Sequence, residues 1–288
     1  MARLAVLGTG RVGGEVAYLA ATLGIADELV LHDTARDLLR AQMLDIRNTG
    51  LDIPVSTDTA LVKESDVCIF SAGLPRNPSI KTRADLLDAN LPVLSDSSVL
   101  LAGFSGVLIT VTNPMDVNNF YLCKKAGIKP GRCIGFGGQL DSARFGLALE
   151  GEGTKGTPCV LGEHGEHQVP VFSRLAGPVP VPRREEILAT LRGASMEIIK
   201  GKGGTVFGPA YHLAMLVKAV VTDSRQLLPC SCVLDGEYGL SGCSLGVPTR
   251  VGKSGIHAIE EWKLDTWEQE KMAEAGAFVG DLCKRAVG

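Results

Sequence analysis

The stretch that decides the fold stands near the start of the chain: Arg3-Leu4-Ala5-Val6-Leu7-Gly8-Thr9-Gly10-Arg11-Val12-Gly13. Its apolar first half predicts a buried strand, and the residues Val12–Leu23 have the pattern of a helix. Between the two, the glycines of a Gly-x-Gly-x-x-Gly motif allow a tight turn whose backbone can approach a pyrophosphate. Free amides at the helix N-terminus favour that negative charge. The stretch therefore predicts a dinucleotide-binding turn formed by Gly8, Thr9, Gly10, Arg11, Val12 and Gly13.

A carboxylate at the end of the next predicted strand indicates which dinucleotide binds. Asp33 follows the strand Glu28–His32, twenty residues after Gly13. At that position a carboxylate accepts hydrogen bonds from an adenosine ribose and repels a 2′-phosphate. Asp33 therefore favours NAD over NADP, while the nearby cations Arg36 and Arg40 leave NADP as the less favoured alternative.

The first 135 residues alternate short apolar runs with helical stretches, the pattern of a parallel sheet covered by helices on both faces. We therefore expect a Rossmann-type doubly wound α/β fold. In such a sheet ligands gather at the carboxyl ends of the strands, where Gly8, Asp33, Gly73 and Asn113 stand. The predicted strands are Leu4–Leu7, Glu28–His32, Asp66–Ser71, Gly106–Val111 and Arg132–Gly135, and the predicted helices are Val12–Leu23, Ala35–Arg47, Arg83–Leu101 and Pro114–Ala126.

After Gly138 the pattern changes, which predicts a second domain. A helix begins near Leu140, a β-rich stretch crosses Thr157–Leu161, and two helices follow near 183–201 and 208–225. A hairpin over 229–251 and a helix from Thr266 complete the chain. We expect a dinucleotide-binding domain over 1–138 and an α+β substrate domain, which carries the catalysis, over 139–288.

Composition and charge exclude several classes of protein. The 288 residues are 45% apolar and 21% charged, far from the compositions of disordered or fibrous chains. With a formal net charge of −3 and no long run of one sign, nothing favours a nucleic-acid or membrane-surface partner. The longest apolar stretch, Val99–Val111, is shorter than the ~20 residues of a membrane helix, and no secretory signal is visible. We expect a cytoplasmic protein.

The eight cysteines are scattered singly, mostly beside apolar residues. Only Cys230 and Cys232 lie close together, in a stretch with the pattern of a strand rather than in a paired zinc-ligand unit. The spacing favours buried free thiols over disulfides or a zinc site.

The segment Gly162-Glu163-His164-Gly165-Glu166-His167 places an imidazole among glycines, and Asp141 precedes it. An aspartate beside a histidine fixes the tautomer of the imidazole and raises its pKa, so the pair is a candidate general acid and base. The two histidines and two glutamates of the segment are also possible metal ligands, which leaves a metal hydrolase open. Their spacing is a weak metal signature, and we expect no metal.

Three arginines point to an anionic substrate. Arg76 and Arg83 bracket the loop after the strand Asp66–Ser71, and Arg144 follows Asp141 by one helical turn. Arginine pairs with a carboxylate through two hydrogen bonds, and a second arginine can polarise a carbonyl that undergoes reduction.

Taken in order, these motifs resemble the lactate/malate dehydrogenase family. The resemblance covers essentially the whole chain, and its length is most similar to the short archaeal-type malate dehydrogenases. It implies a dehydrogenase that moves a hydride between a nicotinamide and C2 of a 2-hydroxy acid. The stretches that carry it are Asp33, Ala72–Arg76, Arg83 with Asn90, Val111–Pro114, Leu140–Phe145, Gly162–Glu166, Lys202–Ala210 and Gly236–Gly239.

The resemblance also implies roles for single residues. His164 is the proton donor and acceptor, and Asp141 orients it. Arg144 binds the C1 carboxylate of the substrate, and Arg83 stabilises the developing alkoxide once a mobile loop excludes water. Asn113 orients the substrate and the nicotinamide. Further positions that match the family are the cofactor contacts Ala72, Gly73, Asn90, Val111, Thr112 and Asn113, and Thr205 in the substrate pocket.

The choice of substrate depends on Arg76, which matches the position where malate enzymes of the family carry arginine and lactate enzymes carry glutamine. It favours oxaloacetate and malate, and hence the tricarboxylic acid cycle, with lactate or another 2-hydroxy acid as the alternative. The loop departs from the family at Pro78-Ser79, which replaces Pro-Gly, and at the additional Lys81. A non-catalytic NAD-binding protein is a more remote alternative. The resemblance further implies a homodimer or homotetramer.

Overall fold

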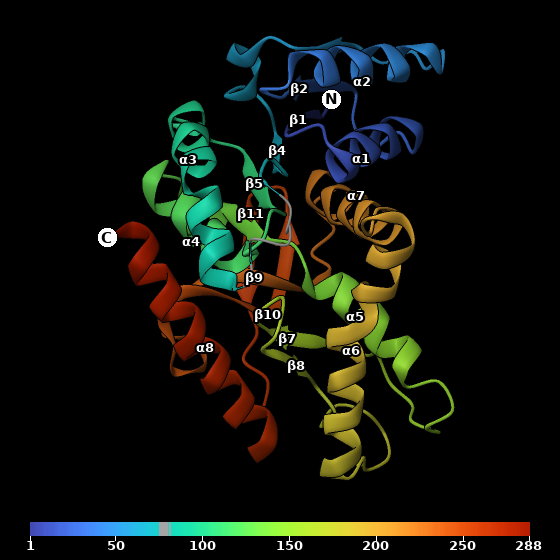
Figure 1. Cartoon of the computed structure of the whole chain (residues 1–288), viewed down its shortest axis with the longest axis vertical. Helices are drawn as coiled ribbons and strands as arrows, with labels where there is room; N and C mark the ends of the chain where they lie inside the picture. The colour runs from blue at the N-terminus through green and yellow to red at the C-terminus, as the bar shows by residue number, and fades with distance from the viewer. Residues whose placement is uncertain (75–79, 81) are drawn as a thin grey trace.

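The computed structural model describes residues 1–74, 80 and 82–288. Over these residues the strands form one continuous sheet in the order β3-β2-β1-β4-β5-β6-β9-β10-β7-β8, with β11 paired to β10. The first six strands pair in parallel, whereas the later strands pair antiparallel. The two parts meet where Gly135 of β6 lies opposite Ser231 of β9. A parallel sheet thus continues directly into an antiparallel one (Figure 1).

The parallel part has the strand order 3-2-1-4-5-6 of a doubly wound dinucleotide-binding sheet. Because helices cover both of its faces, its strands are continuous apolar runs, and Leu4 to Leu7 are at most 1% exposed. The Rossmann-type prediction and its five strands are confirmed, and only the two-residue β3 was not predicted. The strands are β1 (Arg3–Leu7), β2 (Glu28–His32), β3 (Val55–Ser56), β4 (Val67–Phe70), β5 (Val107–Thr110) and β6 (Cys133–Gly135).

Figure 1 shows α3 and α4 on one side of β4 and β5, and α1 with α7 on the other. A capping box starts α3: the Thr82 hydroxyl accepts the Asp85 N–H at 3.0 Å, and the Asp85 carboxylate accepts the Thr82 N–H at 2.9 Å. This cap makes Arg83 the first residue of α3, at the edge of the sheet where β4 ends. The helices of this part are α1 (Arg11–Thr22), α2 (Arg36–Asn48), α3 (Arg83–Leu101) and α4 (Met115–Lys125), with 3-10 turns at Thr59–Val62 and Pro130–Arg132.

The second part of the chain is built from antiparallel strands and long helices. The hairpin expected over 229–251 is confirmed, and the last helix begins at Thr266 as predicted, capped by Asp265. The β-rich stretch expected from Thr157 begins only at Val160. The sequence does not predict the short strands Gln168–Pro170 and Gly255–Ile259. The elements are α5 (Gly138–Ala148), β7 (Val160–Gly162), β8 (Gln168–Pro170), α6 (Val181–Lys202), α7 (Phe207–Val221), β9 (Leu227–Asp235), β10 (Ser241–Gly252), β11 (Gly255–Ile259) and α8 (Thr266–Val287), with a 3-10 turn at Glu237–Gly239.

The helix expected over 208–225 ends earlier than predicted. Asp223 and Arg225 adopt left-handed backbone angles, with φ of 49° and 57°, which end α7 at Val221. No single helix within the described ranges is long and apolar enough to cross a membrane. Helices α6 and α7 meet that condition only as a pair, and the chain bends by 118° between them.

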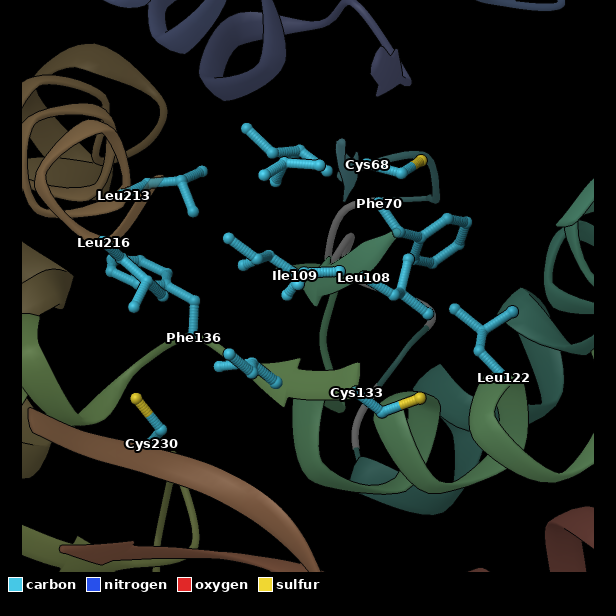
Figure 2. Packing of buried hydrophobic residues seen from close by; sticks show 14 of the residues in the cluster. Cys68, Phe70, Leu108, Ile109, Leu122, Cys133, Phe136, Leu213, Leu216 and Cys230 are labelled. Carbon is cyan, nitrogen blue, oxygen red and sulfur yellow. The ribbon is translucent and has the colours of Figure 1, made fainter. Parts of the chain in front are cut away.

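Side chains of the parallel strands pack against helices on both sides of the sheet (Figure 2). Neighbouring residues of β5 point in opposite directions, Leu108 toward Leu122 of α4 and Ile109 toward Leu213 of α7. All four side chains are fully buried. This packing holds the carboxyl ends of the central strands, and the residues that follow them, in fixed positions.

All eight cysteines are buried and none forms a disulfide, so the expectation of buried free thiols is confirmed. Burial raises the pKa of the thiols of Cys159 and Cys232 to about 12. At neutral pH these thiols are therefore protonated and serve as apolar packing groups.

Candidate active site

The glycine-rich turn joins β1 to α1 and is shaped by two glycines. Gly8 has a φ of +91°, and a Cβ on it would lie 2.3 Å from the backbone nitrogen of Ala72. A Cβ on Gly13 would lie 1.9 Å from the carbonyl oxygen of Gly8. Neither position admits a side chain. A Cβ on Gly10 would instead meet nothing within 4 Å, so this side of the turn is open toward the N-terminus of α1, where a phosphate group fits.

Asp33 lies beside this turn, as its position in the sequence predicts. Its Oδ2 accepts the Thr9 N–H at 2.7 Å, and its Oδ1 accepts the Ala35 N–H at 2.9 Å. The carboxylate is partly exposed and keeps lone pairs for further donors such as ribose hydroxyls. Arg11 contacts a segment that is far away in the sequence: its Nη1 donates to the carbonyl oxygen of Lys202, at the end of α6, at 3.0 Å.

The ends of β4 and β5 are tied together by a second set of predicted cofactor positions. The Asn90 Oδ1 accepts the Leu74 N–H at 2.7 Å, and the Thr112 hydroxyl donates to the carbonyl oxygen of Ala72 at 2.8 Å. A Cβ on Gly73 would lie 2.4 Å from Thr112 and 2.7 Å from the Asn90 Oδ1. The structure thus brings together, at the same edge as the glycine-rich turn, the predicted residues Ala72, Gly73, Asn90, Val111, Thr112 and Asn113.

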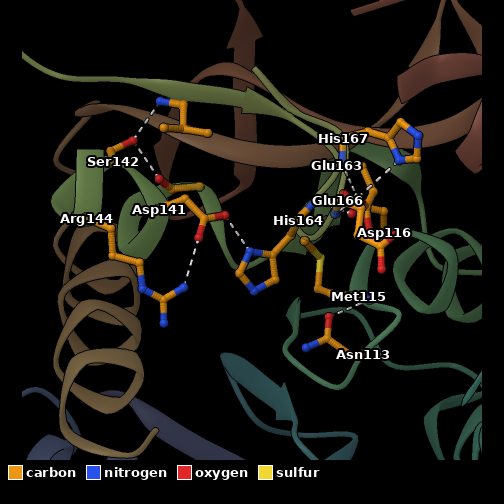
Figure 3. A network of polar contacts seen from close by, with 12 residues as sticks. Asn113, Met115, Asp116, Asp141, Ser142, Arg144, Glu163, His164, Glu166 and His167 are labelled. Atoms are coloured by element: carbon orange, nitrogen blue, oxygen red, sulfur yellow. Dashed lines mark hydrogen bonds and ion pairs between the residues drawn. The ribbon is translucent and has the colours of Figure 1, made fainter. Parts of the chain in front are cut away.

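The two side chains predicted as an acid/base pair, His164 and Asp141, are in contact. His164 Nδ1 lies 2.6 Å from Asp141 Oδ2, and Arg144 Nη1 donates to Asp141 Oδ1 at 3.2 Å (Figure 3). Asp141 is 1% exposed, and α5 carries it one helical turn before Arg144. Burial favours the neutral forms, but the charge of His164 and its hydrogen bond lower the pKa of Asp141, and Asp141 in turn raises the pKa of His164. Because Nδ1 is held by the carboxylate, Nε2 is the ring atom that remains to exchange a proton.

Arg83 reaches the same place from the start of α3. Its Nη2 donates to the carbonyl oxygen of His164 at 3.0 Å and lies 3.4 Å from Glu163 Oε1, while its Nη1 donates to Asn113 Oδ1 at 3.3 Å. A Cβ on Gly165 would lie 1.7 Å from Arg83 Nη2, so this approach requires glycine. Burial alone would raise the pKa of Glu163, but hydrogen bonding from His167 and the Arg83 charge lower it to about 2.

Sequence reasoning missed Asp116, which also lies in this network. Its side chain is buried, and its Oδ2 accepts the His164 N–H at 2.9 Å. Burial and the nearby Glu163 charge raise the pKa of Asp116 to about 6. An acidic residue in the first turn of a helix is ordinary. The only signal in the sequence is that Asp116 stands between the apolar residues Met115 and Val117, two residues after Pro114.

The remaining candidates are less well connected. Thr205 is half-buried in the connection between α6 and α7, close in the chain to the Lys202 carbonyl that Arg11 contacts. Arg76 and Lys81 lie outside the described residues. His167 stacks on Phe278 of α8, with ring centroids 4.3 Å apart. Within the part of the chain that the structure describes, no three His, Cys, Asp or Glu side chains are arranged to hold a metal ion.

Two protein-family models match the chain, one in each half. Residues 2–135 match the lactate/malate dehydrogenase NAD binding domain, and residues 139–279 match the lactate/malate dehydrogenase alpha/beta C-terminal domain. The chain belongs to the lactate/malate dehydrogenase family. The glycine-rich turn falls in the first of these matches, and the contact between Asp141 and His164 falls in the second.

Curated relatives of this dehydrogenase carry both names of the family. The malate dehydrogenase of Natronomonas pharaonis is 38% identical over 98% of each chain. The L-lactate dehydrogenase of a Geobacillus species is 30% identical over 99% of this chain and 97% of its own. Among solved structures, the malate dehydrogenase from Archaeoglobus fulgidus in complex with NADH is 31% identical, with a TM-score of 0.89 over 99% of this chain and 100% of its own. The chain is therefore an NAD-dependent 2-hydroxyacid dehydrogenase, and the family alone does not select the acid.

Proposed function

We propose that the chain is an NAD-dependent malate dehydrogenase that interconverts oxaloacetate and malate. The observation that carries the proposal is the contact of Asp141 with both His164 and Arg144, next to Arg83. A proton donor and two guanidinium groups within one partly buried network match what a 2-oxo acid needs: a proton for the carbonyl oxygen and cations for the carboxylates.

NAD would lie along the carboxyl edge of the parallel strands and supply the acceptor or donor of the hydride at C2 of the substrate. The open side of the turn at Gly10 is the place for its pyrophosphate, and Asp33 the place for its adenosine ribose. The negative charge of Asp33 disfavours the 2′-phosphate of NADP. Asn113, at the end of β5, would orient the nicotinamide and the substrate.

His164 would move the proton. The carboxylate of Asp141 fixes its tautomer through Nδ1, so Nε2 gives a proton to the carbonyl oxygen during reduction and takes it from the hydroxyl during oxidation. The raised pKa of His164 keeps a useful fraction of the imidazole protonated near neutral pH.

The two arginines would bind and polarise the substrate. Arg144 uses one nitrogen for Asp141, and its remaining N–H groups suit the C1 carboxylate. Arg83 donates hydrogen bonds to the main-chain oxygen of His164 and to the side-chain oxygen of Asn113. In this position its charge can act on the reacting oxygen of the substrate. Thr205 would line the pocket from the connection between α6 and α7.

Selection of malate is the proposed role of Arg76, whose cation would pair with the C4 carboxylate. The first four of the relatives, all archaeal malate dehydrogenases, are 37–38% identical, against 30–32% for three L-lactate dehydrogenases, which supports this choice. Lactate or another 2-hydroxy acid is the second candidate, because lactate enzymes match over almost the whole chain.

We further propose a cytoplasmic homodimer or homotetramer, with the two domains divided between residues 138 and 139. The buried free thiols suit a reducing compartment. Exposed apolar side chains on α2, α6 and α7 support self-association. They are Leu38, Leu44, Val181, Met196, Ile198, Ile199, Phe207 and Tyr211.

The test measures initial rates with NADH and with NADPH, each combined with oxaloacetate and with pyruvate. We expect the highest kcat/KM for NADH with oxaloacetate. Arg76→Gln should reduce activity on oxaloacetate more than activity on pyruvate, whereas equal losses would show that Arg76 does not contact the second carboxylate. His164→Ala tests the mechanism separately, and a near-normal rate would disprove the role of His164.

A further inference from the structure

The main chain of His164 is held from both sides by charged groups. Asp116 Oδ2 accepts its N–H at 2.9 Å, and Arg83 Nη2 donates to its carbonyl oxygen at 3.0 Å. Figure 3 shows Asp141 on one side of His164 and Asp116 on the other. Asp116 comes from the first turn of α4, directly after β5, so a third segment of the chain contributes a carboxylate to this histidine.

Asp116 is a costly group to bury for a purely structural purpose. It is 2% exposed, and its Oδ1 has no hydrogen-bond partner among the described residues. The Ser231 hydroxyl lies close enough to lower the pKa of Asp116 without reaching hydrogen-bond geometry with Oδ1. A neutral asparagine would accept the same His164 N–H without burying a charge. The negative charge therefore needs a reason of its own.

The surroundings of Asp116 identify where that charge acts. Asp116, Ser231 and His164 line a small cavity of about 10 Å³, the size of a single water molecule, behind the imidazole. No lysine or arginine is hydrogen-bonded to Asp116 in the described part of the chain, and His164 is the nearby group that gains a positive charge. The titratable and charged groups that face Asp116 are His164 and Glu163 from the β7–β8 turn, Cys243 from β10 and Cys283 from α8, with Arg83 of α3 behind Glu163.

We propose that Asp116 is a positioning residue for proton transfer: it fixes the peptide that carries His164 and supplies a second negative charge that holds the proton on the imidazole. The inference rests on the proposed role of His164. Asp141 acts on the ring directly and sets its tautomer. Asp116 acts through the main chain and through charge.

The decisive variant is Asp116→Asn, which keeps an oxygen for the His164 N–H and removes the charge. We expect the apparent pKa of His164 in kcat/KM for oxo-acid reduction to fall by about 0.5–1 pH unit. Reduction needs the protonated imidazole and oxidation the neutral one, so near pH 6.5 the variant should lose reduction and gain oxidation relative to the wild type. Asp281→Asn, an 80% exposed aspartate on α8, is the matched control and should shift nothing.

The ring itself provides a readout independent of turnover. The imidazole C2 proton of His164, assigned with His164→Asn, should titrate at a lower pH in Asp116→Asn than in the wild type. In the wild type the same signal should show a second inflection near pH 6 as Asp116 takes up its proton. This wild-type measurement tests the proposal even where the variant does not fold.

Two results would overturn the proposal: a uniform loss of rate in Asp116→Asn with an unshifted pH profile and ring titration, or a single inflection in the wild-type titration. Failure of the proposed function is distinguishable, because His164→Ala would then remain active while the ring titration still reported on Asp116.

Discussion

The charge that Asp116 buries should make the protein less stable at neutral pH than its Asp116→Asn variant. The pKa of Asp116 rises from 3.8 to about 6 in the folded protein, because burial and Glu163 disfavour the carboxylate. Between these pH values the folded protein holds a proton that the unfolded chain releases, so stability falls as pH rises. Above pH 6 the full cost is present, and it is about 3 kcal/mol.

Asparagine carries no charge and so does not bear this cost. Its buried amide lacks some hydrogen-bond partners, however, and this reduces the gain in stability by about 1–2 kcal/mol. A net gain of about 1–2 kcal/mol corresponds to a Tm about 2–6 °C higher in a protein of this size. Thermal unfolding followed by circular dichroism at pH 7.5 and pH 4.0 measures the difference, which should disappear or change sign at the lower pH, where folded Asp116 is protonated and only the cost of the asparagine amide remains. A lower Tm at pH 7.5, or a difference that does not depend on pH, would refute the reasoning.

Asp141→Asn removes the carboxylate that holds His164 and Arg144, and oxo-acid reduction at pH 7.5 should fall about 10²-fold, with a smaller loss at pH 6; a loss under threefold in steady-state assays would contradict this. Glu163 has a folded pKa of about 2, below its ordinary 4.5, so its stabilising effect is present above pH 4.5 and is lost as pH falls toward 2; acid unfolding of Glu163→Gln should lack this dependence. Gly10→Ala should keep the Tm of the protein, because the added Cβ meets no protein atom within 4 Å. It should weaken NADH binding in a fluorescence titration, because the Cβ enters the space proposed for the pyrophosphate. Gly13→Ala should lower the Tm, since its Cβ would lie 1.9 Å from the Gly8 carbonyl oxygen, and an unchanged Tm would show that α1 shifts at little cost.

The parallel half of the sheet was predictable because burial on both faces leaves a strong local signal. Its five longer strands are unbroken apolar runs separated by helical periodicity. The strands Val55–Ser56 and Gln168–Pro170 are too short for a periodic pattern and form only by pairing with distant strands. The end of α7 was mispredicted because non-glycine residues rarely take the left-handed angles of Asp223 and Arg225.

For the site, residue type and position made His164, Asp141, Arg83 and Asn113 candidates, and the structure brings these four residues together. Asp116 gave no such signal. A carboxylate in the first turn of a helix is ordinary on a surface, and only the three-dimensional packing of α4 against α8, β9 and β10 buries it beside His164. Arg76 stays a prediction from sequence.

The pairing of Gly135 with Ser231, which joins the parallel and antiparallel strands, also limits how the chain can be divided. A fragment that ended at residue 138 would present the open edge of β6 to solvent, and unpaired strand edges recruit other chains. It would also uncover the face of α1 that α7 packs against. The part of the molecule that binds the dinucleotide therefore shares its sheet and its helix packing with the rest of the chain, and we expect it to be less stable and more prone to aggregate when expressed alone.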